Sequence, residues 1–337
     1  MPGRTGTASP VLLRNGRIVA QYGLVLAVIV VLNFALPRLA PGDAVDYLIP
    51  PEQAGALTVE QRDRVLSRYG LDEAIPVQFE RYVSGLVTGD LQSSIRYRQP
   101  VVDVIGERIG WTVLLVGSAV VLAMAIGTLL GFRSAWRRGR RSDVGTLSGV
   151  MLVDSMPPFF VGMLLILVFS VGLGWFPVFG ALPGTEVAGL SAVGEILQRL
   201  VLPLVTLTLA AIGPIYLVAR SALVSELRED YVLMARAKGL AGRGVRRHAQ
   251  RNALMPVVTI GLLEVGALVG GAAVVETVFS YPGLGRLIYE SVLARDYPVL
   301  QGVFLLLAIG VIVANLIGDL LYPLLDPRVR RPRAATA

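Results

Sequence analysis

The side chains that could perform chemistry in this chain are few, and their neighbours restrict what they can do. Lys238 is the only lysine, His248 is the only histidine, and there is no cysteine. A phosphate-binding P-loop needs Gly-Lys followed by Ser or Thr, but Lys238 is followed by Gly239, so the sequence contains no P-loop. Because there is no cysteine and only one histidine, thiol catalysis, disulfides and multi-histidine metal sites are also excluded. The residue counts alone do not exclude Ser-Lys or carboxylate catalysis, but the sequence shows no such constellation. We therefore expect no catalytic residue, metal or cofactor in this chain.

Four carboxylates fall in or near long apolar stretches: Asp154, Glu264, Glu276 and Asp319. A carboxylate in lipid is costly, so each should face protein or water. Three of the four lie close to the end of an apolar stretch, where water reduces this cost, whereas Glu264 lies deep. We expect a hydrogen bond between helices at Glu264. The alternative is a polar site inside the membrane that relays an ion.

The segments that hold these side chains are long enough to cross a membrane. Of the 337 residues, 54% are hydrophobic and 16% are charged, which is more apolar than an ordinary soluble domain. A span needs roughly 20 residues, and six stretches meet this length: 18–36, 111–132, 150–176, 200–222, 254–279 and 299–321. They predict an all-α membrane protein with six transmembrane helices, the third of which is bent or broken by Pro157-Pro158.

The positions of the cations predict the orientation of these spans. The net charge is +7, but arginines that alternate with apolar runs indicate control of topology and not nucleic-acid binding. Short segments on one side carry 20 Lys and Arg, against three on the other side. Because cytoplasmic segments carry the excess, we predict a multi-pass protein with a retained first helix. Both tails, 1–17 and 324–337, then lie in the cytoplasm.

The first outer connection, 37–110, is long and has the signals of folded structure. Thr58 and Gln61 make a capping box, and Gly70 stands where a helix would end. A second helix is predicted to start at Pro76 and to end at Gly89. This loop is either a lid that packs on the outer ends of the spans or a docking surface for an external partner.

The inner connection 226–256 joins the fourth and fifth predicted spans. On a helix that starts near Glu229, Val232, Ala235 and Gly239 lie along one side. Small side chains there allow another surface to approach the backbone closely. One interpretation is an interfacial helix on anionic headgroups. The alanines and glycine supply too little apolar area for that, so we favour a groove in a partner protein.

The residues of this connection match a known family. Ala235-Arg236-Ala237-Lys238-Gly239, followed by His248, Asn252 and Pro256, resembles the EAA loop of ABC importer permeases. More narrowly, the chain is similar to the B-type permease of the dipeptide/oligopeptide family, which also includes nickel and glutathione importers. The other matching pieces are Gly42-Asp43, Tyr69-Gly70-Leu71-Asp72, Gly89-Asp90-Leu91, Glu276-Thr277-Val278-Phe279, Pro282-Gly283-Leu284-Gly285 and Leu325-Asp326-Pro327-Arg328.

The resemblance implies a type I ABC importer permease fold, with a helical outer loop between helices 1 and 2 and a core over 111–323. Residues 231–245 would form a coupling helix that sits in a groove of an ATPase subunit, and Gly239 would turn the chain. The coupling residues that it implies are Tyr231, Ala235, Arg236, Ala237, Lys238, Gly239, His248, Asn252 and Pro256. The candidates for an outer face or gate are Glu276, Phe279, Pro282, Gly283 and Gly285.

The same resemblance implies the partners and the location. They are a second homologous permease subunit, two ABC ATPase subunits (or one fused) that bind ATP and Mg, and an extracytoplasmic solute-binding protein. The location is the plasma (inner) membrane of a prokaryote. The expected function is half of a translocation pathway for short peptides, with a nickel chelate or glutathione as alternative cargo. An ion-coupled secondary transporter and a membrane scaffold are alternatives of another class.

Overall fold

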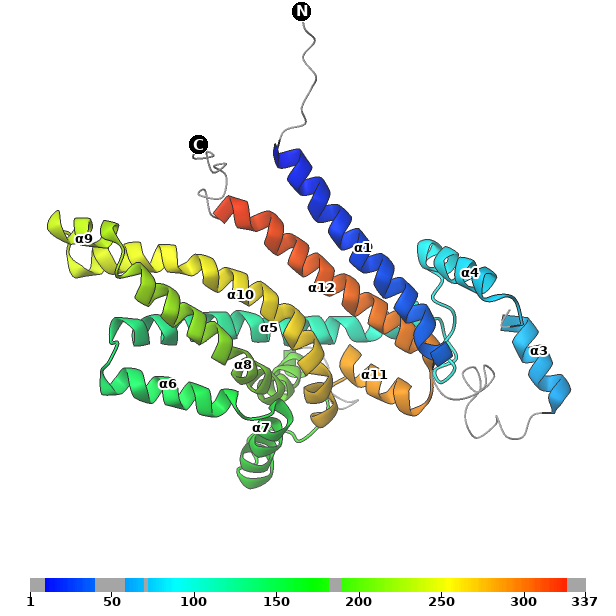
Figure 1. Cartoon of the computed structure of the whole chain (residues 1–337). Helices are drawn as coiled ribbons and strands as arrows, with labels where there is room; N and C mark the ends of the chain where they lie inside the picture. The colour runs from blue at the N-terminus through cyan, green and yellow to red at the C-terminus, as the bar shows by residue number, and fades with distance from the viewer. Residues whose placement is uncertain (1–9, 40–57, 70–71, 182–189, 326–337) are drawn as a thin grey trace, which may run out of the picture. The chain divides into compact units, whose positions relative to one another are not determined.

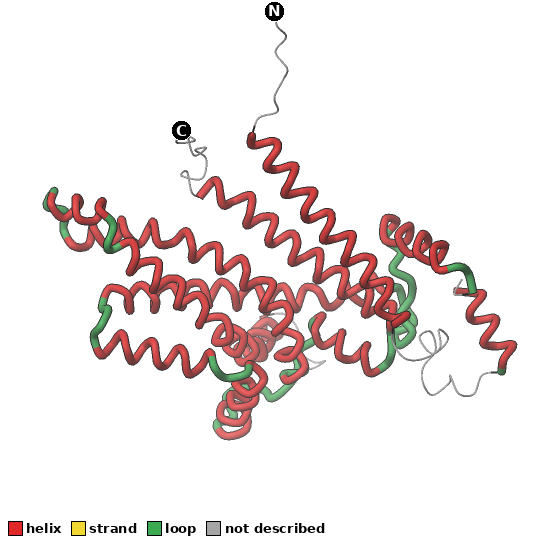
Figure 2. The backbone as a smooth tube through the Cα atoms, viewed as in Figure 1, coloured by secondary structure: helices red, strands yellow, loops and turns green. Residues whose placement is uncertain are grey.

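The computed structural model describes residues 10–39, 58–69, 72–181 and 190–325. Within these ranges the chain is helical, and its one pairing of extended residues is an isolated bridge between Ser93 and Pro100 (Figure 2). The prediction of an all-α protein is therefore confirmed. The chain divides into two compact units. Unit 1 comprises Met1–Ile105 and Glu290–Ile317, and unit 2 comprises Gly106–Tyr289 and Gly318–Ala337.

The helices are labelled in Figure 1. In chain order they are α1 (Pro10–Leu39), α3 (Val59–Tyr69), α4 (Ile75–Thr88), α5 (Val101–Trp136), α6 (Arg141–Asp154), α7 (Pro158–Leu165), the π-helix η2 (Ile166–Gly172), α8 (Leu190–Glu226), α9 (Asp230–Ala237), α10 (Gly242–Val278), α11 (Leu284–Leu293) and α12 (Tyr297–Leu325).

Each predicted span falls on one of these segments. Among the described helices, four are long and apolar enough to cross a membrane, over Val101–Trp136, Ser191–Glu226, Gly242–Val278 and Tyr297–Gly318. The bent pair α6 and α7–η2 is a fifth candidate, and α1 contains the shorter apolar stretch Val19–Ala35. The apolar runs of bilayer length therefore coincide with helices of the structure.

The third predicted span, 150–176, is not one straight helix, and its predicted extent is corrected. α6 begins at Arg141, well before the predicted start, and the break that follows it bends the pair by 98°. Pro157 has a non-helical ψ of 137°, and Pro158 occupies the first turn of α7. A proline lacks the N–H that a continuing helix needs, but it is well suited to a helix start. The predicted break at Pro157-Pro158 is confirmed.

The core of unit 2 is centred on α8 and α10, and both α6 and α7 contact α8. Helix α5 approaches α8 closely because Gly131 has no side chain: a Cβ there would lie 2.7 Å from the Cβ of Ala219. α5 also meets α10, where the side chain of Met124 fills the space beside Gly261. The largest fully buried side chains of this unit include Tyr216, Leu115, Leu207, Ile215 and Leu223. Small residues at helix crossings are what close packing in a membrane requires.

In unit 1, α1 is tied to α4 and α12 by a buried amide. Asn33 Nδ2 donates hydrogen bonds to Tyr82 Oη (3.0 Å) and to the carbonyl oxygen of Gln301 (2.8 Å). Gln301 Nε2 returns a bond of 2.9 Å to the Asn33 carbonyl oxygen. The ring of Phe34 packs edge-on against Phe79. The first span is therefore held by specific polar contacts as well as by apolar packing.

The first outer loop contains the helices that its sequence predicts. The Thr58 amide donates to Gln61 Oε1 (2.9 Å) and the Gln61 amide donates to Thr58 Oγ1 (3.4 Å), so the capping box is confirmed. α4 ends at Gly89, whose φ of +80° is the left-handed conformation that favours glycine. Gly70, the other predicted helix end, lies outside the described residues.

Candidate functional site

The predicted coupling segment contains a short helix, α9, between the two long helices α8 and α10. α9 ends at Ala237, and the chain turns through Gly239, which has a φ of +76°. The Gly239 amide donates to the Arg236 carbonyl (2.9 Å), and the Leu240 amide donates to the Ala235 carbonyl (3.2 Å). The turn at Gly239 is as predicted. The helix over 231–245 is not, because this turn ends α9 and residues 242–245 belong to α10.

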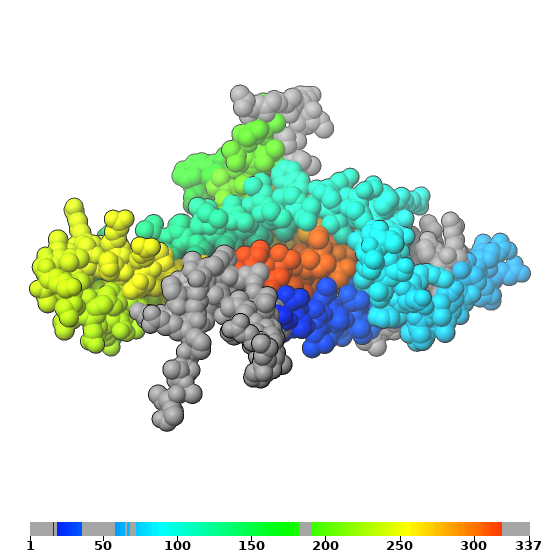
Figure 3. Space-filling view, turned by 90° about the horizontal axis from the view of Figure 1, so that it is seen from above, coloured from blue at the N-terminus to red at the C-terminus, as the bar shows by residue number. Residues whose placement is uncertain are grey.

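One side of α9 is buried against its own unit and the other is open. Val232 is 1% exposed, and Tyr231 and Ala235 pack against the core of unit 2. Leu233 and Met234 are 69% and 58% exposed. The surface of α9 and the start of α10, coloured yellow, is open in Figure 3. The face that a partner can reach therefore includes two large apolar side chains that sequence reasoning did not single out.

Tyr231 ties α9 to its neighbours. Its hydroxyl donates a hydrogen bond to the carboxylate of Glu226, the last residue of α8, and it lies close to Asn252 on α10. Burial, reinforced by the bond to Glu226, raises the pKa of Tyr231 to about 12. The hydroxyl therefore stays protonated and keeps its hydrogen bond at neutral pH. Two of the predicted coupling residues, Tyr231 and Asn252, are brought together here.

The other predicted coupling residues lie on exposed surfaces. Arg236, Ala237 and Lys238 are exposed at the end of α9, and His248 and Pro256 are exposed on α10. Within the described part of the chain, the side chains of Arg236, Lys238 and His248 form no hydrogen bond or ion pair. Their charges and donors are free for a partner.

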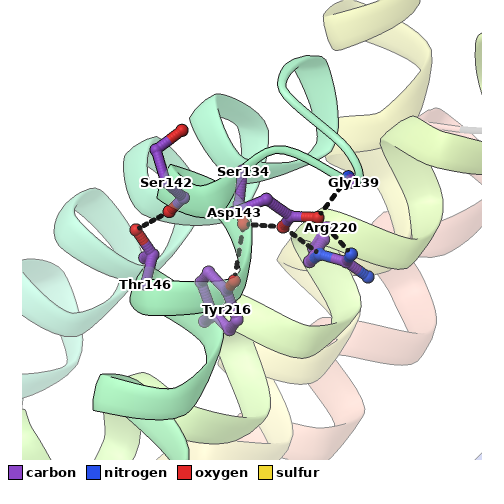
Figure 4. A network of polar contacts seen from close by, with 7 residues as sticks. All are labelled: Ser134, Gly139, Ser142, Asp143, Thr146, Tyr216 and Arg220. Atoms are coloured by element: carbon purple, nitrogen blue, oxygen red, sulfur yellow. Dashed lines mark hydrogen bonds and ion pairs between the residues drawn. The ribbon is translucent and has the colours of Figure 1, made fainter.

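A buried ion pair between α6 and α8 was missed by sequence reasoning (Figure 4). Asp143 is 3% exposed near the start of α6, and it binds Arg220 on α8. The Asp143 carboxylate also accepts hydrogen bonds from the Ser134 hydroxyl and from the Gly139 amide (3.0 Å). Ser134 Oγ in turn lies 2.7 Å from Tyr216 Oη. Each carboxylate oxygen thus has at least two partners, which is the condition for a stable buried charge.

The sequence did contain a signal for this pair. Asp143 is the one carboxylate that directly follows the arginine-rich connection at 133–141. Sequence reasoning counted Arg220 only as a charge that sets topology. A carboxylate at that position, 77 residues before its partner, could have been read as a buried counter-ion.

The C-terminal end of α10 carries a second polar cluster, formed around Glu276. Its carboxylate is fully buried. Oε1 accepts a hydrogen bond from Thr112 Oγ1 on α5 (2.7 Å), and Oε2 accepts from the backbone amides of Gly285 (2.7 Å) and Arg286 (3.1 Å). Glu276 therefore caps the start of α11, where unpaired amides and the helix dipole favour a negative charge.

The other predicted gate residues surround this cap. A Cβ at Gly283 would overlap the carboxylate of Glu276, and a Cβ at Gly285 would overlap the backbone of Ala273. Phe279 is buried, and its carbonyl oxygen accepts from the Gly180 amide (2.9 Å). Pro282 is half-buried in the same turn. The structure therefore gathers these candidates into one closely packed turn between α10 and α11.

Glu264 is half-exposed on α10, and the predicted hydrogen bond between helices is not formed with any described residue. Asp154 is close enough to Glu264 for the two charges to repel. The Asp154 carboxylate lies against Gly213 of α8, where a Cβ would overlap it. The side chain of Asp319 lies outside the described residues. Within the described ranges, no group of three or more His, Cys, Asp or Glu could hold a metal.

Comparisons with known proteins agree with this architecture. Residues 127–331 match the family described as binding-protein-dependent transport system inner membrane component. The chain is 38% identical over 321 residues to the di/tripeptide transport system permease protein DppB of Pseudomonas aeruginosa, covering 90% of this chain and 95% of that one. It is 36% identical over 310 residues to the oligopeptide transport system permease protein AppB of Bacillus subtilis, with the same coverage.

A solved structure shows the fold. The inward-facing conformation of the MetNI methionine ABC transporter aligns with a TM-score of 0.54 and 20% identity, covering 66% of this chain and 96% of that chain. The expected type I importer permease fold is thereby confirmed.

Proposed function

This chain belongs to the family of binding-protein-dependent transport system inner membrane components, and from that membership we propose that it forms half of the membrane pathway of an ATP-driven importer of short peptides. The family works in the inner membrane with ATPase and solute-binding partners. The long relatives named for di/tripeptide and oligopeptide transport support peptides as the cargo, in preference to a nickel chelate or glutathione. No relative supports an ion-coupled transporter or a membrane scaffold.

The observation that carries the coupling role is the exposed face of α9. Leu233 and Met234 project from a helix that is anchored at both ends, with exposed Arg236 and Lys238 beside them. An apolar pair with a cationic rim fits a groove in an ATPase subunit. Movement of that subunit would reach α8 through the bond between Tyr231 and Glu226.

The remaining assignments follow from charge and symmetry. The excess of arginine supports a cytoplasmic location for α9 and both tails. The turn around Glu276 then faces outward, where a solute-binding protein would deliver the peptide. A second, homologous permease subunit would complete the pathway, because one chain supplies only one wall of it.

The experiment compares uptake with complex assembly. In a complex reconstituted into vesicles, L233S/M234S is expected to lose association with the ATPase and import of a labelled dipeptide, while the chain still inserts. The matched control is V193S/L197S, two exposed apolar residues near the other end of α8. Normal assembly and import by L233S/M234S would show that α9 is not the docking face. If the unchanged complex imports glutathione or nickel but no peptide, the cargo is wrong and the docking role still stands.

A further inference from the structure

A cavity of about 560 Å³ lies at the end of unit 2 that carries α9, and its walls are strongly basic. It is lined by Leu129, Arg133, Trp136, Arg137, Arg140 and Arg246. The first five come from the end of α5 and the turn after it, and Arg246 comes from the second turn of α10. The guanidinium of Arg246 lies over the ring of Trp136, 5.7 Å from its centroid, which fixes one wall of the cavity.

The four arginines of this cavity lack counter-ions within the described part of the chain. Arg220, by contrast, is neutralised by Asp143 through two hydrogen bonds. Four like charges around one space repel one another. A ligand that relieves this repulsion must be an anion with several acceptor oxygens, because guanidinium groups bind phosphate oxygens in pairs.

An apolar stripe leads away from the cavity along α5. Leu122, Ile126 and Leu129 precede Arg133 at spacings that place all four on one face of the helix, and the three apolar side chains are 39%, 38% and 69% exposed. Within a bilayer, such a face meets acyl chains. Trp136 lies where the apolar stripe gives way to arginines, which is typical of the membrane interface. The cavity is therefore polar at one end and continuous with a lipid-facing track at the other.

We propose that this cavity binds an anionic phospholipid of the cytoplasmic leaflet. The phosphate lies among Arg133, Arg137, Arg140 and Arg246, and an acyl chain runs along Leu129, Ile126 and Leu122. A soluble phosphate would satisfy the arginines but would leave the stripe unused. Basic pockets between transmembrane helices on the cytoplasmic side are suited to lipid headgroups. Since the site joins α5 to the first turns of α10, the bound lipid would brace the base of the coupling segment.

The test uses the fluorescence of Trp136, which lines the cavity. The chain has three tryptophans, so W111F/W175F leaves Trp136 as the single reporter. The full chain is placed in nanodiscs of phosphatidylcholine that contain brominated phosphatidylglycerol or, at the same fraction, brominated phosphatidylcholine. We expect phosphatidylglycerol to quench Trp136 with at least about a five-fold preference, the contribution of one arginine near a membrane surface.

Two further arms identify the source of the preference. R133Q/R246Q should abolish this preference, whereas R138Q/R141Q, which replaces two exposed arginines outside the cavity, should leave most of it intact. Excess inorganic phosphate should also leave it unchanged. Equal quenching by both lipids would overturn the proposal, and so would an equal loss in the control variant. Abolition of the preference by phosphate would reassign the cavity to a soluble anion. Mass spectrometry of lipids retained by the unsubstituted chain provides an independent measurement of the same preference.

Discussion

Arg220 and Asp143 form a two-point ion pair, with 2.9 Å between Nε and Oδ1 and 2.8 Å between Nη2 and Oδ2. The pair joins the start of α6 to α8, less than two turns before α8 ends at Glu226. Because the Asp143 carboxylate is buried and both of its oxygens are hydrogen-bonded, the pair fixes the position of α6 relative to α8. Through this contact, α6 would move together with α8 when α9 is displaced.

Replacing Asp143 with Asn should destabilise the protein, because Arg220 would keep its charge in a largely buried place without a counter-ion. The expected loss is about 3 kcal/mol, the usual result of removing one partner of a buried pair. Thermal unfolding in detergent measures it. R141Q, which changes an exposed charge two residues away, should have little effect. Equal melting temperatures for D143N and the unchanged chain would show that the pair does not hold the helices together.

Replacing Gly131 with Val should push α5 away from α8. A Cβ at this position lies 2.7 Å from the Cβ of Ala219 and 2.7 Å from the carbonyl oxygen of Tyr216. Overpacking of this kind costs about 1–3 kcal/mol. The same substitution at Gly117, also on α5, meets no atom within 4 Å and is the matched control. Thermal unfolding of the two variants should separate them, and similar melting temperatures would contradict the close crossing.

Replacing Glu276 with Gln should loosen the turn at the start of α11. One of the two oxygens that accept hydrogen bonds becomes an amide NH₂, which must face a donor, either Thr112 Oγ1 or the amides of Gly285 and Arg286. We expect a loss of about 1–2 kcal/mol in stability and a marked decrease in peptide uptake. Hydrogen exchange at residues 284–287 reports the local effect. E107Q, an exposed change on α5, should alter neither, and unchanged exchange in E276Q would remove Glu276 from its capping role.

Tyr231 should remain neutral far beyond the usual range of a tyrosine. Its pKa is raised from 10.0 to about 12 by burial and by its bond to Glu226. The stabilisation from the neutral hydroxyl is therefore complete below pH 10 and is lost as the pH rises through about 12. An ultraviolet titration of the unchanged chain minus that of Y231F isolates this group. A transition near 10 in the difference spectrum would mean that the hydroxyl is solvated and that the bond to Glu226 is absent.

Local signals in the sequence predicted the local structure well. Apolar runs located the long helices, Pro157-Pro158 located the break between α6 and α7, and Thr58 with Gln61 located a helix start. Each of these features is decided by residues that are neighbours in the chain. The turn at Gly239 belongs to the same class, because the backbone conformation it requires favours glycine.

Contacts between distant residues were beyond this reasoning. The exposed face of α9 depends on how the chain returns into α10, which buries Val232 and leaves Leu233 and Met234 outside. The pair between Asp143 and Arg220, and the missing partner of Glu264, likewise depend on how α6, α8 and α10 pack. Spacing along one helix gives its faces but does not say which face meets a neighbour.

The length of α10 has a mechanical consequence. α10 is a single helix of 37 residues, about 55 Å long at the usual rise, with the coupling turn at one end and the Glu276 cap at the other. It can therefore act as a lever: a small tilt at the end near the coupling turn would become a larger displacement at the end near Glu276. Pro256 interrupts the hydrogen bonding inside this helix and divides the lever into a shorter arm toward the coupling turn and a longer arm toward Glu276. The stiffness of α10 at Pro256 would then determine how much of a movement at the coupling turn is transmitted to the turn around Glu276.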